Sequence, residues 1–137
     1  MTHSGELKPL ALTLLDAQGW DNKMRALVMA SKHLPMLEQG QRTETNQVKG
    51  CDSDVWLDRV SDDTTGCFMA YSPSKVIRGV LAIILEQTNN LSPEAVATFD
   101  FDAFGDELSL SRFLSQSRGN GLRQVIDRIK TLASTQT

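Results

Sequence analysis

Cys51 is the residue of this chain best suited to nucleophilic chemistry. It follows Gly50, precedes the polar run 52–54, and stands directly before an apolar stretch that begins at Val55. Glycine has no Cβ, so it permits a tight turn and the close approach of another chain. A thiol at such a corner can be presented to another molecule, and thiol reactivity depends on access and on charged neighbours. The sequence alone leaves a second reading open, a cysteine packed at the end of a strand, because free cysteine is often buried.

Charged residues near Cys51 act on the thiol in opposite directions. An unperturbed cysteine has a pKa of about 8.5, so only a minority is thiolate near neutral pH. The carboxylates of Asp52 and Asp54 disfavour the thiolate, whereas Lys49, or Arg118 folded against the thiol, would favour it. The sequence does not decide which influence is larger.

The remaining candidates for chemistry are poorer. Cys67 stands beside Phe68 in a predicted strand, which favours a buried structural thiol over a resolving cysteine. His3 and His33 have no spacing to the cysteines that suggests a metal site, and zinc usually needs about four ligands. We therefore predict neither a metal site nor a bound cofactor.

Length and charge exclude several classes of protein. The chain has 137 residues, which predicts a single domain over 1–137. Its formal net charge of -3 provides no basic field for nucleic acid. No stretch approaches the roughly 18 to 20 apolar residues of a membrane span, and residues 1–15 lack the pattern of an export signal. We expect a cytoplasmic protein that binds neither nucleic acid nor membrane, with both of its cysteines kept as thiols.

Hydrophobic spacing predicts helices at the amino-terminal end and a hairpin after them. Apolar residues recur at helical intervals over 7–15 and over 20–34, where Pro35 ends the second helix. A polar loop over 38–46 then leads into a short strand that ends at Lys49. Strands over 55–60 and 67–71, joined by a turn, form the predicted hairpin.

The second half of the chain predicts mainly helices. The apolar run 76–85, preceded by capping residues, should be a central, mostly buried helix. Ser92 followed by proline predicts a short helix over 93–97. Another short helix is expected over 102–107. The last helix should begin at 119–121 and continue to Leu132, with 133–137 fraying.

Five blocks of the sequence carry a more specific signal. They are Trp20-Asp21-Asn22-Lys23, His33-Leu34-Pro35, Gly50-Cys51-Asp52-Ser53-Asp54-Val55-Trp56-Leu57, Ile77-Arg78-Gly79-Val80-Leu81-Ala82 and Ser117-Arg118-Gly119-Asn120-Gly121-Leu122. In this order and at this spacing they resemble the SufE/CsdE family of sulfur acceptor proteins, over nearly the whole chain. The resemblance implies an α+β fold in which a small antiparallel sheet of about three strands packs against several helices, similar to the scaffold proteins of iron-sulfur cluster assembly.

The resemblance also implies a reaction and its partners. Cys51 would receive sulfur as a persulfide from a pyridoxal-phosphate cysteine desulfurase, of the SufS or the CsdA type, and would stimulate that enzyme. A downstream acceptor or iron-sulfur scaffold would then take the sulfur. Gly50 and Arg118 would support the cysteine, although an arginine near a helix start can equally pair with a carboxylate. Because the local charges act in opposite directions, we hypothesise separately that the desulfurase activates Cys51 on docking and that the thiol is unreactive in the free protein.

We also consider other functions for this chain. A non-sulfur-carrying adaptor would bind the desulfurase without using Cys51, and a homodimer is possible. A stand-alone thiol enzyme lacks the expected neighbours, because no Cys-x-x-Cys motif occurs and no histidine stands near Cys51. A cluster scaffold holds iron with several thiolates, which two cysteines at opposite ends of a hairpin cannot easily supply.

The chain departs from the family pattern before the central helix. Many relatives carry an acidic segment there, whereas this chain reads Ala70-Tyr71-Ser72-Pro73-Ser74. The run 52–54 also differs from the forms associated with the two branches of the family, so the choice between a SufS-type and a CsdA-type partner stays open. We expect Trp56 on a sheet face or in the core. Arg78 should be a snorkelling surface residue or a member of a salt bridge.

Overall fold

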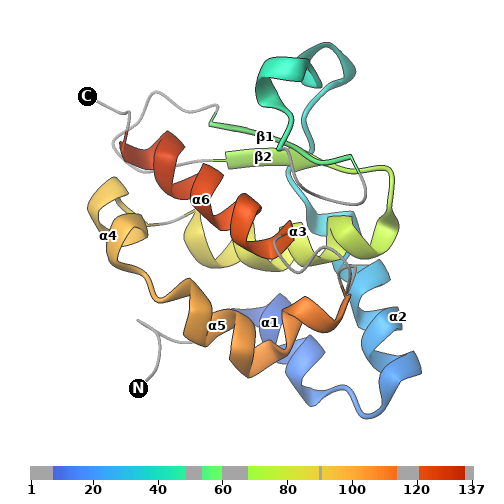
Figure 1. Ribbon diagram of the computed structural model, residues 1–137. Helices are drawn as coiled ribbons and strands as arrows, with labels where there is room; N and C mark the ends of the chain where they lie inside the picture. Colours follow the sequence, from blue (N-terminus) through green and yellow to red (C-terminus); the bar gives the residue numbers. More distant parts are fainter. Residues whose placement is uncertain (1–7, 49–53, 60–67, 90, 114–120, 135–137) are drawn as a thin grey trace.

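The computed structural model describes residues 8–48, 54–59, 68–89, 91–113 and 121–134. A two-stranded hairpin lies on one side of a central helix, α3, and further helices surround that helix (Figure 1). The described elements are α1 (Pro9–Asp16), α2 (Trp20–Ala30), β1 (Trp56–Arg59), β2 (Phe68–Tyr71), α3 (Lys75–Thr88), α4 (Pro93–Thr98), α5 (Phe101–Leu108) and α6 (Gly121–Ser134). Short 3-10 helices occupy Ser31–His33, Gln39–Gln41, Glu44–Asn46 and Leu110–Phe113.

The two amino-terminal helices follow their sequence signals. Pro9 opens α1 in the first helical turn, where its missing N–H costs nothing. Gly19 precedes α2 with a φ of 83°, a conformation that suits glycine. The helix predicted over 20–34 is α-helical to Ala30 and then tightens into the 3-10 turn Ser31–His33.

The sheet is smaller than predicted but is extended at both edges. β1 and β2 pair antiparallel, with Trp56 opposite Tyr71 at one end and Arg59 opposite Phe68 at the other. The expected third strand is replaced, among the described residues, by single-residue bridges. Met36 pairs parallel with Ala70, and Gln47 pairs antiparallel with Trp56. The hairpin turn and Cys67 lie outside the described residues.

Helix α3 confirms the prediction of a central, mostly buried helix. The side chain of Ser74 caps it by accepting a hydrogen bond from the backbone N–H of Ile77 at 3.3 Å. Every residue from Gly79 to Leu85 is buried. Because no face of this part of the helix meets solvent, its sequence is apolar throughout and shows no polar face. The side-chain amide of Asn89, just after the helix, donates to the carbonyl of Phe68 and accepts from its N–H, which attaches α3 to β2.

The carboxy-terminal helices complete the core. Ser92 caps α4 and Asp100 caps α5, each by accepting a hydrogen bond from a backbone N–H. The expectation of fraying from residue 133 was wrong in part, because α6 continues to Ser134. Ala133 is 1% exposed, so packing holds the last turn in place.

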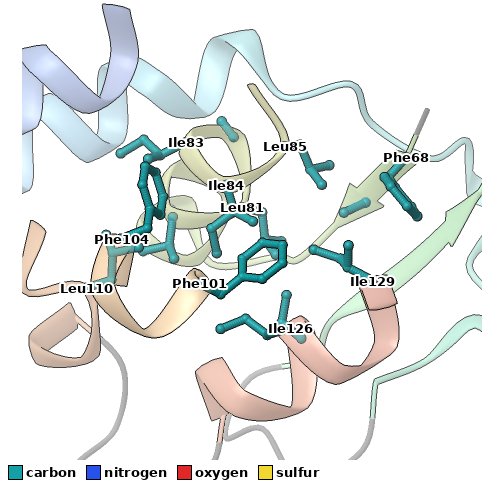
Figure 2. Close-up of a cluster of buried hydrophobic side chains, with 14 of the residues drawn as sticks. Phe68, Leu81, Ile83, Ile84, Leu85, Phe101, Phe104, Leu110, Ile126 and Ile129 are labelled. Carbon is teal, nitrogen blue, oxygen red and sulfur yellow. The ribbon is translucent and has the colours of Figure 1, made fainter. Parts of the chain in front are cut away.

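One hydrophobic cluster joins the helices to the hairpin. Phe68 of β2, Leu85 of α3 and Ile129 of α6 are each fully buried or nearly so. Figure 2 shows side chains of α3, α5 and α6 meeting around Phe101, with Phe68 at the sheet end of the same cluster. The fold is therefore α+β, with a small antiparallel sheet packed on helices, as predicted.

Candidate functional site

The predicted site residues Cys51, Gly50 and Arg118 lie outside the described residues. The structure therefore neither brings these three residues together nor separates them. What it does describe is the chain on both sides of the segment 49–53 and on both sides of the segment 114–120.

The described ends of the segment 49–53 are joined to each other. The N–H of Val48 donates to the carbonyl of Val55 at 2.7 Å. The side-chain amide of Gln47 donates to a carboxylate oxygen of Asp54 at 3.2 Å. Val48 and Val55 are both buried, so the two ends are attached to the core. Residues Gln47, Val48, Asp54 and Val55 thus form a hydrogen-bonded base for the segment that contains Cys51, which we call the closed base.

Two aromatic side chains of the hairpin, Trp56 and Tyr71, lie next to this base. Trp56 bridges to Gln47 on one side and pairs with Tyr71 on the other. The ring centroids of Trp56 and Tyr71 are 6.2 Å apart, and both side chains are half-buried. Trp56 therefore lies on a sheet face, one of the two positions predicted for it.

Two arginines lie against the same tyrosine. The guanidinium carbon of Arg42 is 3.5 Å from the Tyr71 ring centroid, and that of Arg78 is 5.5 Å from it. Such cation–π contacts are favourable. Arg78 is half-buried, which fits the predicted snorkelling arginine, and it forms no salt bridge among the described residues. Sequence reasoning missed Arg42, whose neighbours in space come from distant parts of the chain.

Helix α6 packs beside the same base. A guanidinium nitrogen of Arg128 donates to the carbonyl of Thr45, just before the segment that contains Cys51. A shallow cavity of about 280 Å³ separates Val48 from α6; its lining is completed by Gln124, Asp127, Arg128 and Thr131. The first turn of α6 also follows directly on the segment 114–120, to which Arg118 belongs.

An aromatic stack holds the other described end of the segment 114–120. Trp20 of α2 stacks on Phe113 with ring centroids 5.1 Å apart and planes 15° from parallel. The guanidinium carbon of Arg112 is 5.4 Å from the Trp20 ring centroid. Trp20 belongs to the sequence block 20–23. Through Phe113 it contacts the chain that leads into the block 117–122.

The described residues show neither a metal-binding cluster nor a membrane span. No group of three or more histidine, cysteine or acidic side chains is placed there to hold a metal ion. No helix in these ranges is long and apolar enough to cross a membrane.

The fold has a counterpart among solved structures. The solution structure of a hypothetical protein from Thermus thermophilus superposes with a TM-score of 0.68. The match covers 94% of this chain and 96% of that one, at 17% sequence identity. At this identity the likeness establishes the fold: helices around a small antiparallel sheet.

Sequence comparisons identify the family. The family model of SufE, described as an Fe-S metabolism associated domain, matches residues 9–133. This chain therefore belongs to the SufE family. A SufE-like protein of Haemophilus influenzae is 30% identical over 87% of this chain and 95% of its own length. A SufE-like protein of Rhizobium meliloti is 34% identical over 83% of this chain and 84% of its own. The sulfur acceptor protein CsdE of Escherichia coli is 31% identical over 80% of this chain and 76% of its own.

Proposed function

We propose that this protein accepts sulfur as a persulfide on Cys51 from a pyridoxal-phosphate cysteine desulfurase. It would stimulate that enzyme and pass the sulfur on for iron-sulfur cluster assembly. Membership of the SufE family and similarity to a sulfur acceptor protein support the proposal. Thiol chemistry of this kind suits a reducing compartment such as the cytoplasm.

The transfer is a thiol exchange with no net oxidation or reduction. The Cys51 thiolate would attack the outer sulfur of a persulfide on the desulfurase. The bond between that sulfur and the desulfurase cysteine breaks as the new sulfur–sulfur bond forms on Cys51. The desulfurase cysteine leaves as a thiolate. The rate of such an exchange depends on the thiolate fraction of the attacking group and on the leaving thiol.

The structural observation that carries the proposal is the closed base of the segment 49–53. A sulfur carrier must present its thiol inside another protein's active site, which calls for a short connection on a rigid support. The hydrogen bond between Val48 and Val55 and the bridge between Gln47 and Trp56 provide that support.

Intact-protein mass spectrometry tests the proposal directly. The protein is mixed with desulfurase, pyridoxal phosphate and cysteine, and wild type is compared with Cys51→Ser and Cys67→Ser. We expect a reductant-reversible gain of about one sulfur atom in wild type and in Cys67→Ser, because thiol exchange needs only the Cys51 thiolate. Cys51→Ser should gain none.

Desulfurase activity, measured in the same mixtures, distinguishes a carrier from an adaptor. An adaptor would keep full stimulation of the desulfurase after Cys51→Ser and would gain no sulfur in any form. A gain that persists in Cys51→Ser and disappears in Cys67→Ser would move the acceptor to Cys67 and contradict the proposal.

A further inference from the structure

Two guanidinium groups lie near the Tyr71 ring, and neither has a negative partner among the described residues. Arg78 forms neither a hydrogen bond nor an ion pair within the described structure, and its Nε is buried. The Nε of Arg42 donates to the carbonyl of Leu37 at 3.1 Å, and Arg42 also forms no ion pair there. A cation without a carboxylate partner is stabilised by an anion that approaches it, so an anion that reaches either guanidinium group would be favoured.

The neighbouring sequence supplies no counter-charge. The segment 70–74, which includes Tyr71 and leads into α3, contains no carboxylate. Tyr71 instead offers a ring face to both guanidinium groups. A ring face attracts a cation but does not neutralise its charge, so the arginines retain the capacity to bind an anion.

The position of the cluster favours an anion carried by a protein. Tyr71 pairs with Trp56, and Trp56 is bridged to Gln47 at the base of the segment that contains Cys51. A partner that reaches this segment would also cover the cluster. The two cavities of the described structure, one beside Val48 and one between α1 and α2, are lined by other residues.

We propose that the Arg42–Tyr71–Arg78 cluster binds an acidic side chain of the docking desulfurase. The planar guanidinium fork matches a carboxylate in a bidentate arrangement. The acidic side chain would supply in trans the negative charge that the segment 70–74 lacks. This inference rests on the proposed function, because the partner is the desulfurase.

Binding titrations with the desulfurase test the inference, and they need no sulfur transfer. SufS-type and CsdA-type desulfurases are each titrated by calorimetry with wild type, Arg78→Gln and Arg78→Lys at low and high salt. For the enzyme that binds, we expect Arg78→Gln to raise Kd about tenfold at low salt, with a smaller change at high salt. Arg78→Lys keeps the charge and should lose less.

Arg25→Gln is the matched control. Arg25 is an exposed arginine of α2 that lies away from the hairpin, and its removal changes net charge equally. Its Kd should stay within about twofold of wild type, because a charge far from the contact is screened. Arg42→Gln is a second variant, and thermal unfolding of each protein checks that it is folded.

The possible outcomes separate the two proposals. If wild type binds and Arg78→Gln and Arg42→Gln bind equally well, the cluster does not hold an acidic side chain and this inference alone is overturned. An equal loss in Arg25→Gln would also overturn it, since the effect would then be general charge. If wild type binds neither desulfurase, the proposed function itself fails.

Discussion

At the scale of single residues, the chemistry proposed for Cys51 depends on a thiolate in an acidic chain. The formal net charge is -3, and Asp52 and Asp54 are its neighbours in sequence. The carboxylate of Asp54 accepts a hydrogen bond from Gln47, so it takes part in the base of the segment. Arg42 and Arg78 lie against the Tyr71 ring. We expect the Cys51 thiol to be activated by the partner on docking.

The first prediction concerns the reactivity of that thiol. In Cys67→Ser protein, iodoacetamide should alkylate Cys51 at the rate of an unactivated thiol. The rate should rise with pH through neutrality, because more thiolate forms. Mass spectrometry at timed intervals measures it. Rapid alkylation that is already maximal below neutral pH would show that the free protein activates Cys51 by itself.

At the scale of elements, the contact between α2 and α3 depends on a glycine. A Cβ added to Gly79 would lie 2.1 Å from the backbone oxygen of Leu27. Backbone atoms cannot move aside as a flexible side chain can, so only glycine lets the two helices approach this closely. The position of α3 relative to the hairpin, and hence of the candidate site, depends on this crossing.

Gly79→Ala should therefore destabilise the protein. Overpacking in a core costs roughly 1–3 kcal/mol, and the higher helix propensity of alanine recovers at most about 1 kcal/mol. We expect the free energy of unfolding to fall by about 2 kcal/mol, measured by urea denaturation. Gly40→Ala is the control, because a Cβ there meets nothing within 4 Å. An equal effect in both variants would contradict the close contact.

At the scale of the whole molecule, three distant stretches of chain meet at the base of the segment 49–53. The region around Val48, the hairpin and α6 are joined there by the bridge at Trp56 and by the Arg128 contact with Thr45. α6 reaches this base while also packing on the core through Ile126 and Ile129 (Figure 2). The site is thus supported by the same cluster that holds the fold together.

Docking of a desulfurase should be visible as a local change in hydrogen exchange. Peptides that include residues 48–53 should change protection in the complex, because the partner must reach Cys51. Peptides from the buried part of α3, Gly79–Leu85, should not change, since the core is already excluded from water. Exchange measured with and without desulfurase tests this. Unchanged protection of 48–53 in a saturated complex would contradict docking at this segment.

Local signals allowed much of the fold to be predicted. The caps Ser74 and Ser92, the prolines at helix starts and the spacing of apolar residues act within a few positions, so they reveal the helices and the hairpin. The candidate site residues were proposed from local chemistry and family resemblance; Cys51, Gly50 and Arg118 lie outside the described residues and stay predictions.

The sequence by itself determined where the helices and the hairpin form, because caps, prolines and apolar periodicity act over a few residues. The tertiary structure decided which residues share a surface. It brought Arg42 and Arg78 to the Tyr71 ring, placed Arg128 of α6 at Thr45, and buried Ala133 at a helix end expected to fray. These contacts join residues far apart in the chain, and only the packing of whole elements around α3 sets which of them meet.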